Sequence, residues 1–153
     1  MKTALTFILT AALYSFSFGQ IEFKTDDAEF DANLNGVNDK AKLDIKLFDK
    51  NLSIEYGVPE KKIEELHTVK MEPAEIFMAL ELARLSKKTV DDVFGVYKVN
   101  KGKGWGEIAK QMGIKPGSKE FHALKDASKK HGNGKKSEKQ KSKGKANGNG
   151  KGK

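Results

Sequence analysis

The 153-residue chain contains no cysteine. No disulfide can therefore hold the fold together, and thiol catalysis, thiolate metal sites and a lipid anchor on an N-terminal cysteine are all excluded. Small domains without disulfides depend on their apolar core, so we expect a core large enough to stabilise the fold alone. The chain is long enough for one such domain and too short for two.

Long apolar runs are also absent, with one exception at the N-terminus. Lys2 precedes an almost uncharged apolar stretch, residues 4–16, and the small residues Ser17 and Gly19 stand at positions −3 and −1 of a cleavage point before Gln20. This is the pattern of a secretory signal peptide, residues 1–19. The run is shorter than the roughly 20 residues that a membrane-spanning helix requires, so we expect no transmembrane segment. The pattern predicts a secreted or periplasmic chain after cleavage between Gly19 and Gln20.

Arginine is nearly missing, since Arg84 is the one arginine among 29 basic residues. Residues 20–97 hold 11 basic and 17 acidic side chains, residues 98–127 hold 7 and 3, and residues 128–153 hold 10 and 1. The chain is thus acidic in its first half and strongly basic in its second, which indicates a polyanionic partner. Because lysine lacks the planar fork that reads base edges, contact with a nucleic acid should be insensitive to sequence.

Apolar residues recur with helical spacing between residues 28 and 127. A first amphipathic helix is predicted between Asn38 and Tyr56, although residues 43–47 also alternate as a strand would. The helix predicted from Pro73 is apolar nearly all round, so we place it at the centre of the domain. The remaining predicted helices span residues 59–67, 89–97, 105–112 and 118–124. Five to six helices with short connections predict an all-α fold, a small orthogonal bundle.

The two flanks of this domain lack helical periodicity. Residues 20–27 show no clear pattern and are predicted to be a flexible leader. Residues 128–153 contain a single apolar residue, Ala146. Lysine, glycine, asparagine and serine cannot bury enough surface to offset the ordering of the backbone. We therefore predict a helical domain over residues 28–127 and a disordered, lysine- and glycine-rich tail after it.

The most distinctive stretch is KGKGWGEIAKQMGIKPGSKEFHALK, from Lys101 to Lys125. It resembles the C-terminal segment of an uncharacterised group of small exported bacterial proteins that share the pattern GKGWGxIAxxxGIKPGSxxFHALK. The resemblance extends upstream to about Met71, through PAEIFMALELARLSKK and VYKVN. It implies an exported protein and brings no activity with it.

The glycine-rich loop in this stretch supports two interpretations. Its glycines allow a close approach of the backbone, and it leads into a helix N-terminus, where free N–H groups and the helix dipole attract anions. The candidates for an anion site are Lys101, Gly102, Lys103, Gly104 and Gly106. In the alternative, the glycines serve the turn and the helix after it anchors the core. The anchors would then be Trp105, Ile108, Met112 and Phe121.

No complete catalytic or metal-binding motif is recognisable. Residues 31–36, DANLNG, resemble the opening of a calcium loop, but Lys42 stands where the bidentate glutamate belongs, which favours a polar loop before a helix. Residues 64–67 form a single ExxH, whereas diiron bundles need two. Residues 108–114 resemble the first half of a helix-turn-helix, but Pro116 interrupts the second half. We expect no metal, no cofactor and no enzymatic activity.

Two interpretations of function remain. In the first, the chain is an exported non-enzymatic interaction protein, and its basic C-terminal half binds envelope polyanions or extracellular nucleic acid by releasing counterions. In the second, it is an accessory or structural helical module that binds another secreted or envelope protein through the bundle. The salt dependence of binding, measured with and without the tail, separates the two.

Overall fold

The computed structural model describes residues 22–132, which form seven α-helices, one short 3₁₀-helix and no strand. In chain order they are α1 (Ala28–Leu43), α2 (Ile45–Tyr56), α3 (Glu60–Thr68), α4 (Pro73–Ser86), α5 (Val90–Asn100), η1 (Lys101–Lys103), α6 (Trp105–Gln111) and α7 (Lys119–Gly132). The predicted all-α fold is confirmed. The predicted signal peptide and the tail from residue 133 lie outside the described residues. Within them, no helix has both the length and the apolar character needed to cross a bilayer.

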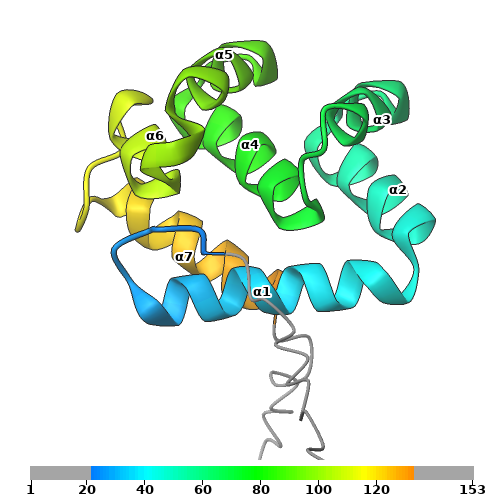
Figure 1. Ribbon diagram of the computed structural model, residues 1–153, viewed down its shortest axis with the longest axis horizontal. Coiled ribbons are helices and arrows are strands. Elements are labelled where there is room, and N and C mark those ends of the chain that lie inside the picture. The colour runs from blue at the N-terminus through cyan, green and yellow to red at the C-terminus, as the bar shows by residue number, and fades with distance from the viewer. Residues whose placement is uncertain (1–21, 133–153) are drawn as a thin grey trace, which may run out of the picture.

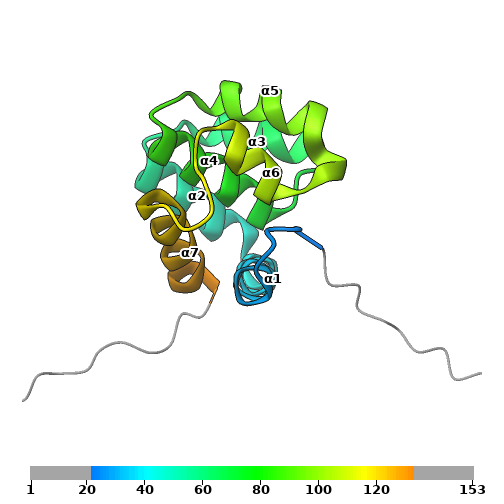
Figure 2. The ribbon, with the colours of Figure 1, turned by 90° about the vertical axis from the view of Figure 1, so that its left-hand side faces the viewer.

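Helix α4 lies at the centre of the domain, as its nearly continuous apolar surface predicts (Figure 1). It contacts α1 and α7, which lie side by side beneath it (Figure 2), and it also contacts α2, α3 and α5. Every residue from Ala74 to Ala83 is buried. The two carboxylates in this run, Glu75 and Glu81, are satisfied by the Tyr97 hydroxyl and by Arg84, respectively.

The first predicted helix is wrong in its extent. Residues 38–56 do not form one helix, because the backbone leaves the helical conformation at Asp44 (φ −157°, ψ 89°). The Asp44 side chain accepts a hydrogen bond from the Leu47 N–H at 3.0 Å and so begins α2, as a typical N-cap does. The alternative strand over residues 43–47 does not form either. With α1 starting at Ala28, there are seven α-helices in the described part of the chain instead of five to six.

The polar stretch that was expected to be a loop lies inside α1. Residues 31–39 are helical, and Asn33 and Asn38 face the core. The Asn38 side-chain oxygen accepts a hydrogen bond at 2.8 Å from the N–H of Ala74, one of the unpaired donors at the start of α4. Asparagine is therefore tolerated at this buried position because it caps a neighbouring helix.

The flexible leader predicted over residues 20–27 is wrong for residues 22–27, which we call the N-terminal strap. The side chain of Phe23 is 1% exposed and belongs to the core. Thr25 is also buried, and its hydroxyl donates to the Asp31 carboxylate at 2.7 Å. The strap therefore packs on the domain as part of the fold.

The predicted start of the tail at Ser128 is also wrong, because α7 continues to Gly132. Ser128 and Gly132 are buried, and the ring of His131 lies 4.7 Å from that of Phe77. At Gly132 the backbones of α7 and α1 come so close that an added Cβ would overlap the carbonyl of Asn33. A glycine that looked typical of disorder is thus required by the packing of two helices.

Candidate functional site: a lysine-rich end of the domain

The helix that follows the glycine-rich loop anchors the core. Trp105 is 3% exposed, and Ile108 and Met112 are equally buried. The Trp105 ring lies 5.3 Å from that of Tyr97, whereas Phe121 on α7 is only partly buried. One side of α6 thereby packs against α5, and Phe121 contributes from the periphery.

The glycines of the loop make room for the N-terminal strap. The Trp105 N–H donates to the Phe23 carbonyl at 2.8 Å, and the Gly106 N–H donates to the Lys24 carbonyl at 3.1 Å. A Cβ on Gly104, whose φ is +91°, would overlap the Lys24 side chain, and a Cβ on Gly106 would lie 3.0 Å from the Lys24 carbonyl oxygen. No pattern in the sequence indicates this contact, because the strap shows no periodicity of its own.

This arrangement limits which residues of the predicted anion site a ligand can reach. Two of the N–H groups at the start of α6 already donate to carbonyl oxygens. Gly104 and Gly106 are buried beneath the strap, whereas Lys101, Gly102 and Lys103 are exposed. The five candidates therefore do not form one cradle, and only Lys101, Gly102 and Lys103 are accessible to a ligand.

Exposed lysines are instead frequent between the end of α5 and the start of α7, a part of the chain in which α5, η1 and α6 contact one another. We call this group the basic end; its members are Lys98, Lys101, Lys103, Lys115 and Lys119. Across the described chain, none of the five forms an ion pair. Two carboxylates lie near them in the sequence: Glu107, which accepts a hydrogen bond from Gln111 and keeps its negative charge, and Glu120, which follows Lys119. Five lysines against these two carboxylates give the basic end an excess of positive charge.

Further along α7, Lys125 and Lys129 are balanced by acidic groups of α1 and the strap. Lys125 lies 2.7 Å from Asp27 and 2.9 Å from Glu29, and Lys129 lies 3.6 Å from Glu29. Hydrogen bonds with Lys125 lower the pKa of both carboxyl groups, and the same contacts raise the pKa of Lys125. Lys110 on α6 is likewise paired, with Asp26 at 3.6 Å. This pairing separates the structural lysines from those of the basic end.

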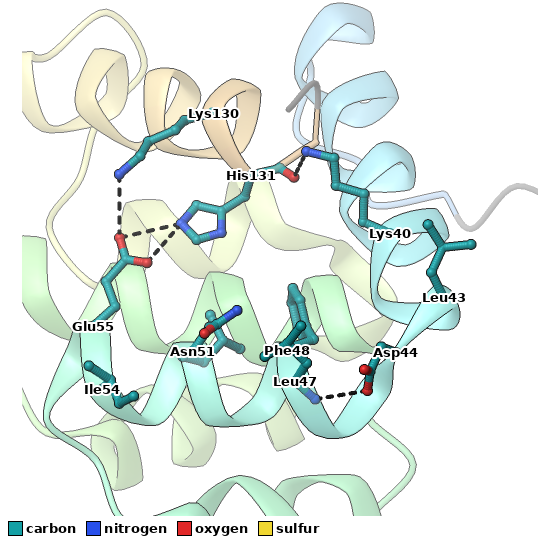
Figure 3. A pocket seen from close by; sticks show the side chains of 11 residues that line it. Lys40, Leu43, Asp44, Leu47, Phe48, Asn51, Ile54, Glu55, Lys130 and His131 are labelled. Atoms are coloured by element: carbon teal, nitrogen blue, oxygen red, sulfur yellow. Dashed lines mark hydrogen bonds and ion pairs between the residues drawn. The ribbon is translucent and has the colours of Figure 1, made fainter. Parts of the chain in front are cut away.

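The histidines and carboxylates of the domain do not gather into a reactive cluster. His67, the histidine of the ExxH sequence, bonds through Nε2 to the Asp49 carboxylate at 3.0 Å and links α3 to α2. Among residues 22–132, no three potential metal-ligating side chains lie together. An open groove of about 600 Å³ runs between α2 and the ends of α1 and α7 (Figure 3). Leucine and isoleucine side chains form much of its lining, so it offers contact surface more than reactive groups.

No protein-family model matches the chain, and no curated protein and no solved structure matches it either. The function must therefore be inferred from the residues themselves, and above all from the distribution of charge.

Proposed function

We propose that this chain is an exported, non-enzymatic interaction protein, built on a small orthogonal helical bundle, whose basic C-terminal half binds polyanions. The ligand class is an envelope polysaccharide or extracellular nucleic acid. The basic end is the observation that carries the proposal, because its five exposed lysines have no acidic partner among residues 22–132. Elsewhere, Lys62, Lys110 and Lys125 are held by carboxylates.

The mechanism is electrostatic. Lysines that approach a polyanion displace its condensed counterions, and the entropy of their release supplies the free energy of binding. The ten lysines of residues 128–153 add to the same positive charge. Because these side chains are flexible point charges, the contacts are diffuse and independent of sequence in the ligand.

Export is the second part of the proposal and rests on the signal-peptide pattern of residues 1–19. Cleavage before Gln20 leaves the strap intact, since Phe23 is the first buried residue between residues 22 and 132. Mass spectrometry of the exported protein should show a mature N-terminus at Gln20. An exported chain that still begins at Met1 would contradict this part.

Charge-matched variants test the binding site. Replacing Lys101, Lys103, Lys115 and Lys119 with glutamine should weaken retention on heparin clearly. The control replaces the exposed Lys61, Lys70, Lys87 and Lys88 with glutamine, which gives the same net charge from α3 and from the loops that flank α4. Equal retention of the two variants would show that net charge, and not the basic end, determines binding.

A further inference from the structure

A second surface, unlike the basic end, is apolar. Six large apolar side chains are exposed between residues 22 and 132, and four of them fall within residues 43–54. Leu43 is 86% exposed, Leu47 53% and Ile54 72%, and we call these three the apolar ridge. Solitary exposed apolar residues are ordinary, but a cluster of this kind marks an interaction surface.

The ridge follows one side of α2. Leu47 and Ile54 are seven residues apart, so their side chains lie on the same side of the helix. Lys50 is three residues after Leu47 and four before Ile54, which places it between them. Leu43, the last residue of α1, extends the ridge beside the groove (Figure 3). Apolar and basic side chains therefore alternate along one exposed surface.

The charged groups near the ridge differ in whether they have an ionic partner. Asp44 caps α2 through a backbone N–H and keeps its negative charge, and Asp49 bonds to His67 on the opposite side. Glu55 lies 3.2 Å from His131 and 3.9 Å from Lys130 at the edge of the groove. In contrast, Lys46 and Lys50 form no ion pair with any residue of the described chain.

We propose that the apolar ridge docks the protein on an anionic lipid surface. Leu47 and Ile54 enter the boundary between headgroups and acyl chains, and Lys46 and Lys50 extend their ammonium groups to the lipid phosphates. Leu43, Leu47 and Ile54 also line the groove and are each more than half exposed, so a deformable lipid layer can cover them without a partner of matching shape. This binding is peripheral and separate from the proposed polyanion binding at the basic end.

Vesicle sedimentation of the full exported chain tests the proposal. At about 1 M salt, where the Debye length is about 3 Å, the contacts of the tail and of the basic end are screened, but apolar insertion persists. Wild type should remain bound to phosphatidylglycerol vesicles, and L43S/L47S/I54S should bind at least tenfold more weakly. Val99→Ser, which changes an exposed valine next to the basic end, should bind as wild type does. Circular dichroism should show the same helicity in all three proteins.

A second pair of variants tests the lysines at about 0.1 M salt. K46Q/K50Q should bind these vesicles several-fold more weakly than K61Q/K70Q, which has the same net charge. Three results would each overturn the proposal: wild type released from vesicles at high salt, a triple variant that binds as wild type does, or equal binding by the two lysine pairs. A different outcome is a soluble dimer that wild type forms and the triple variant does not, while both bind vesicles equally. That result would assign the ridge to contact with a second copy of the chain. If wild type bound these vesicles but did not bind heparin, the proposed polyanion binding would be contradicted and the lipid docking would not.

Discussion

The backbone N–H of Trp105 donates to the carbonyl oxygen of Phe23 at 2.8 Å. This bond joins the first described segment of the chain to the glycine-rich loop, which is far away in the sequence. It explains why a loop that looked ready to bind an anion instead receives the N-terminal strap. The same contact leaves the neighbouring lysines at the surface, where they form the basic end.

Alanine substitutions in the loop should separate a docking role from a binding role. Gly104→Ala and Gly106→Ala should each lower the free energy of unfolding by about 1–3 kcal/mol, because a Cβ meets the strap at both positions. Gly102→Ala is the control, since nothing lies within 4 Å of its added Cβ. Chemical denaturation of the three variants is the measurement. Equal stability of all three would contradict the contact between strap and loop.

Trp105→Ala should destabilise the domain by about 3–5 kcal/mol, the range for truncating a large aromatic side chain in a core. Val99→Ala, at a position that is 81% exposed, should change stability by no more than about 0.5 kcal/mol. As the chain has a single tryptophan, its fluorescence reports this site alone. The emission of wild type should be blue-shifted and poorly quenched by iodide. Emission at the wavelength of free tryptophan would argue against a buried ring.

Acid should weaken the domain through Asp27 and Glu29. Hydrogen bonds with Lys125 lower the pKa of both carboxyl groups below their ordinary values near 4. A carboxyl group whose pKa is lower in the folded state stabilises the fold above its unfolded pKa, and this contribution is lost as the pH falls through the folded pKa. Melting temperatures measured between pH 6 and pH 2 should therefore fall mainly below about pH 4.

Lys125→Gln should make this acid-dependent loss smaller, because the partner of both carboxylates is removed. Asp27→Asn keeps a good N-cap for α1 and should also reduce the loss, whereas Asp27→Ala removes the cap and should cost about 1 kcal/mol at neutral pH. If all three variants kept the acid dependence of wild type, the loss would have to come from other carboxylates.

Truncation should locate the end of the folded domain. A chain ending at Gly132 should melt as the full chain does. A chain ending at Ala127 loses the His131 carbonyl that accepts from Lys40 at 2.6 Å, as well as the ring contact with Phe77. Its free energy of unfolding should fall by more than the about 1 kcal/mol of a typical point substitution. Identical melting of the two truncated chains would place residues 128–132 outside the fold.

The sequence predicted the central and amphipathic helices well because their stability comes from local periodicity. Residues 73–86 became the buried α4, and Trp105, Ile108 and Met112 entered the core as their spacing indicated. These features depend on residues three and four apart, which a single sequence displays directly.

The errors share a physical origin in long-range contacts. Asn38 looks like a loop residue until its partner, the Ala74 N–H, is known. Gly132 looks disordered until it is placed against Asn33, and the strap becomes ordered only through Trp105 and Gly106. Asp44 is the exception, because its capping of α2 is a local signal. The apolar residues at helical spacing on both sides of it indicated one continuous helix instead.

The basic end could be predicted only in part from the sequence. Counting charges revealed an excess of lysine after residue 98. The count could not show that Lys110 and Lys125 are paired with Asp26 and Asp27 of the strap, whereas Lys103 and Lys115 are not. The difference depends on where the strap lies.

The salt dependence of heparin affinity tests the proposed function most directly. The full chain should show a linear double-logarithmic plot with a slope of several units, because each phosphate or sulfate contact releases a counterion. A chain ending at Gly132 keeps the basic end and should retain a slope of about −2 to −5. Replacing Lys101, Lys103, Lys115 and Lys119 with glutamine in that shorter chain should bring the slope close to zero. A slope near zero for the full chain, or an unchanged slope in the four-lysine variant, would contradict polyanion binding through the basic end.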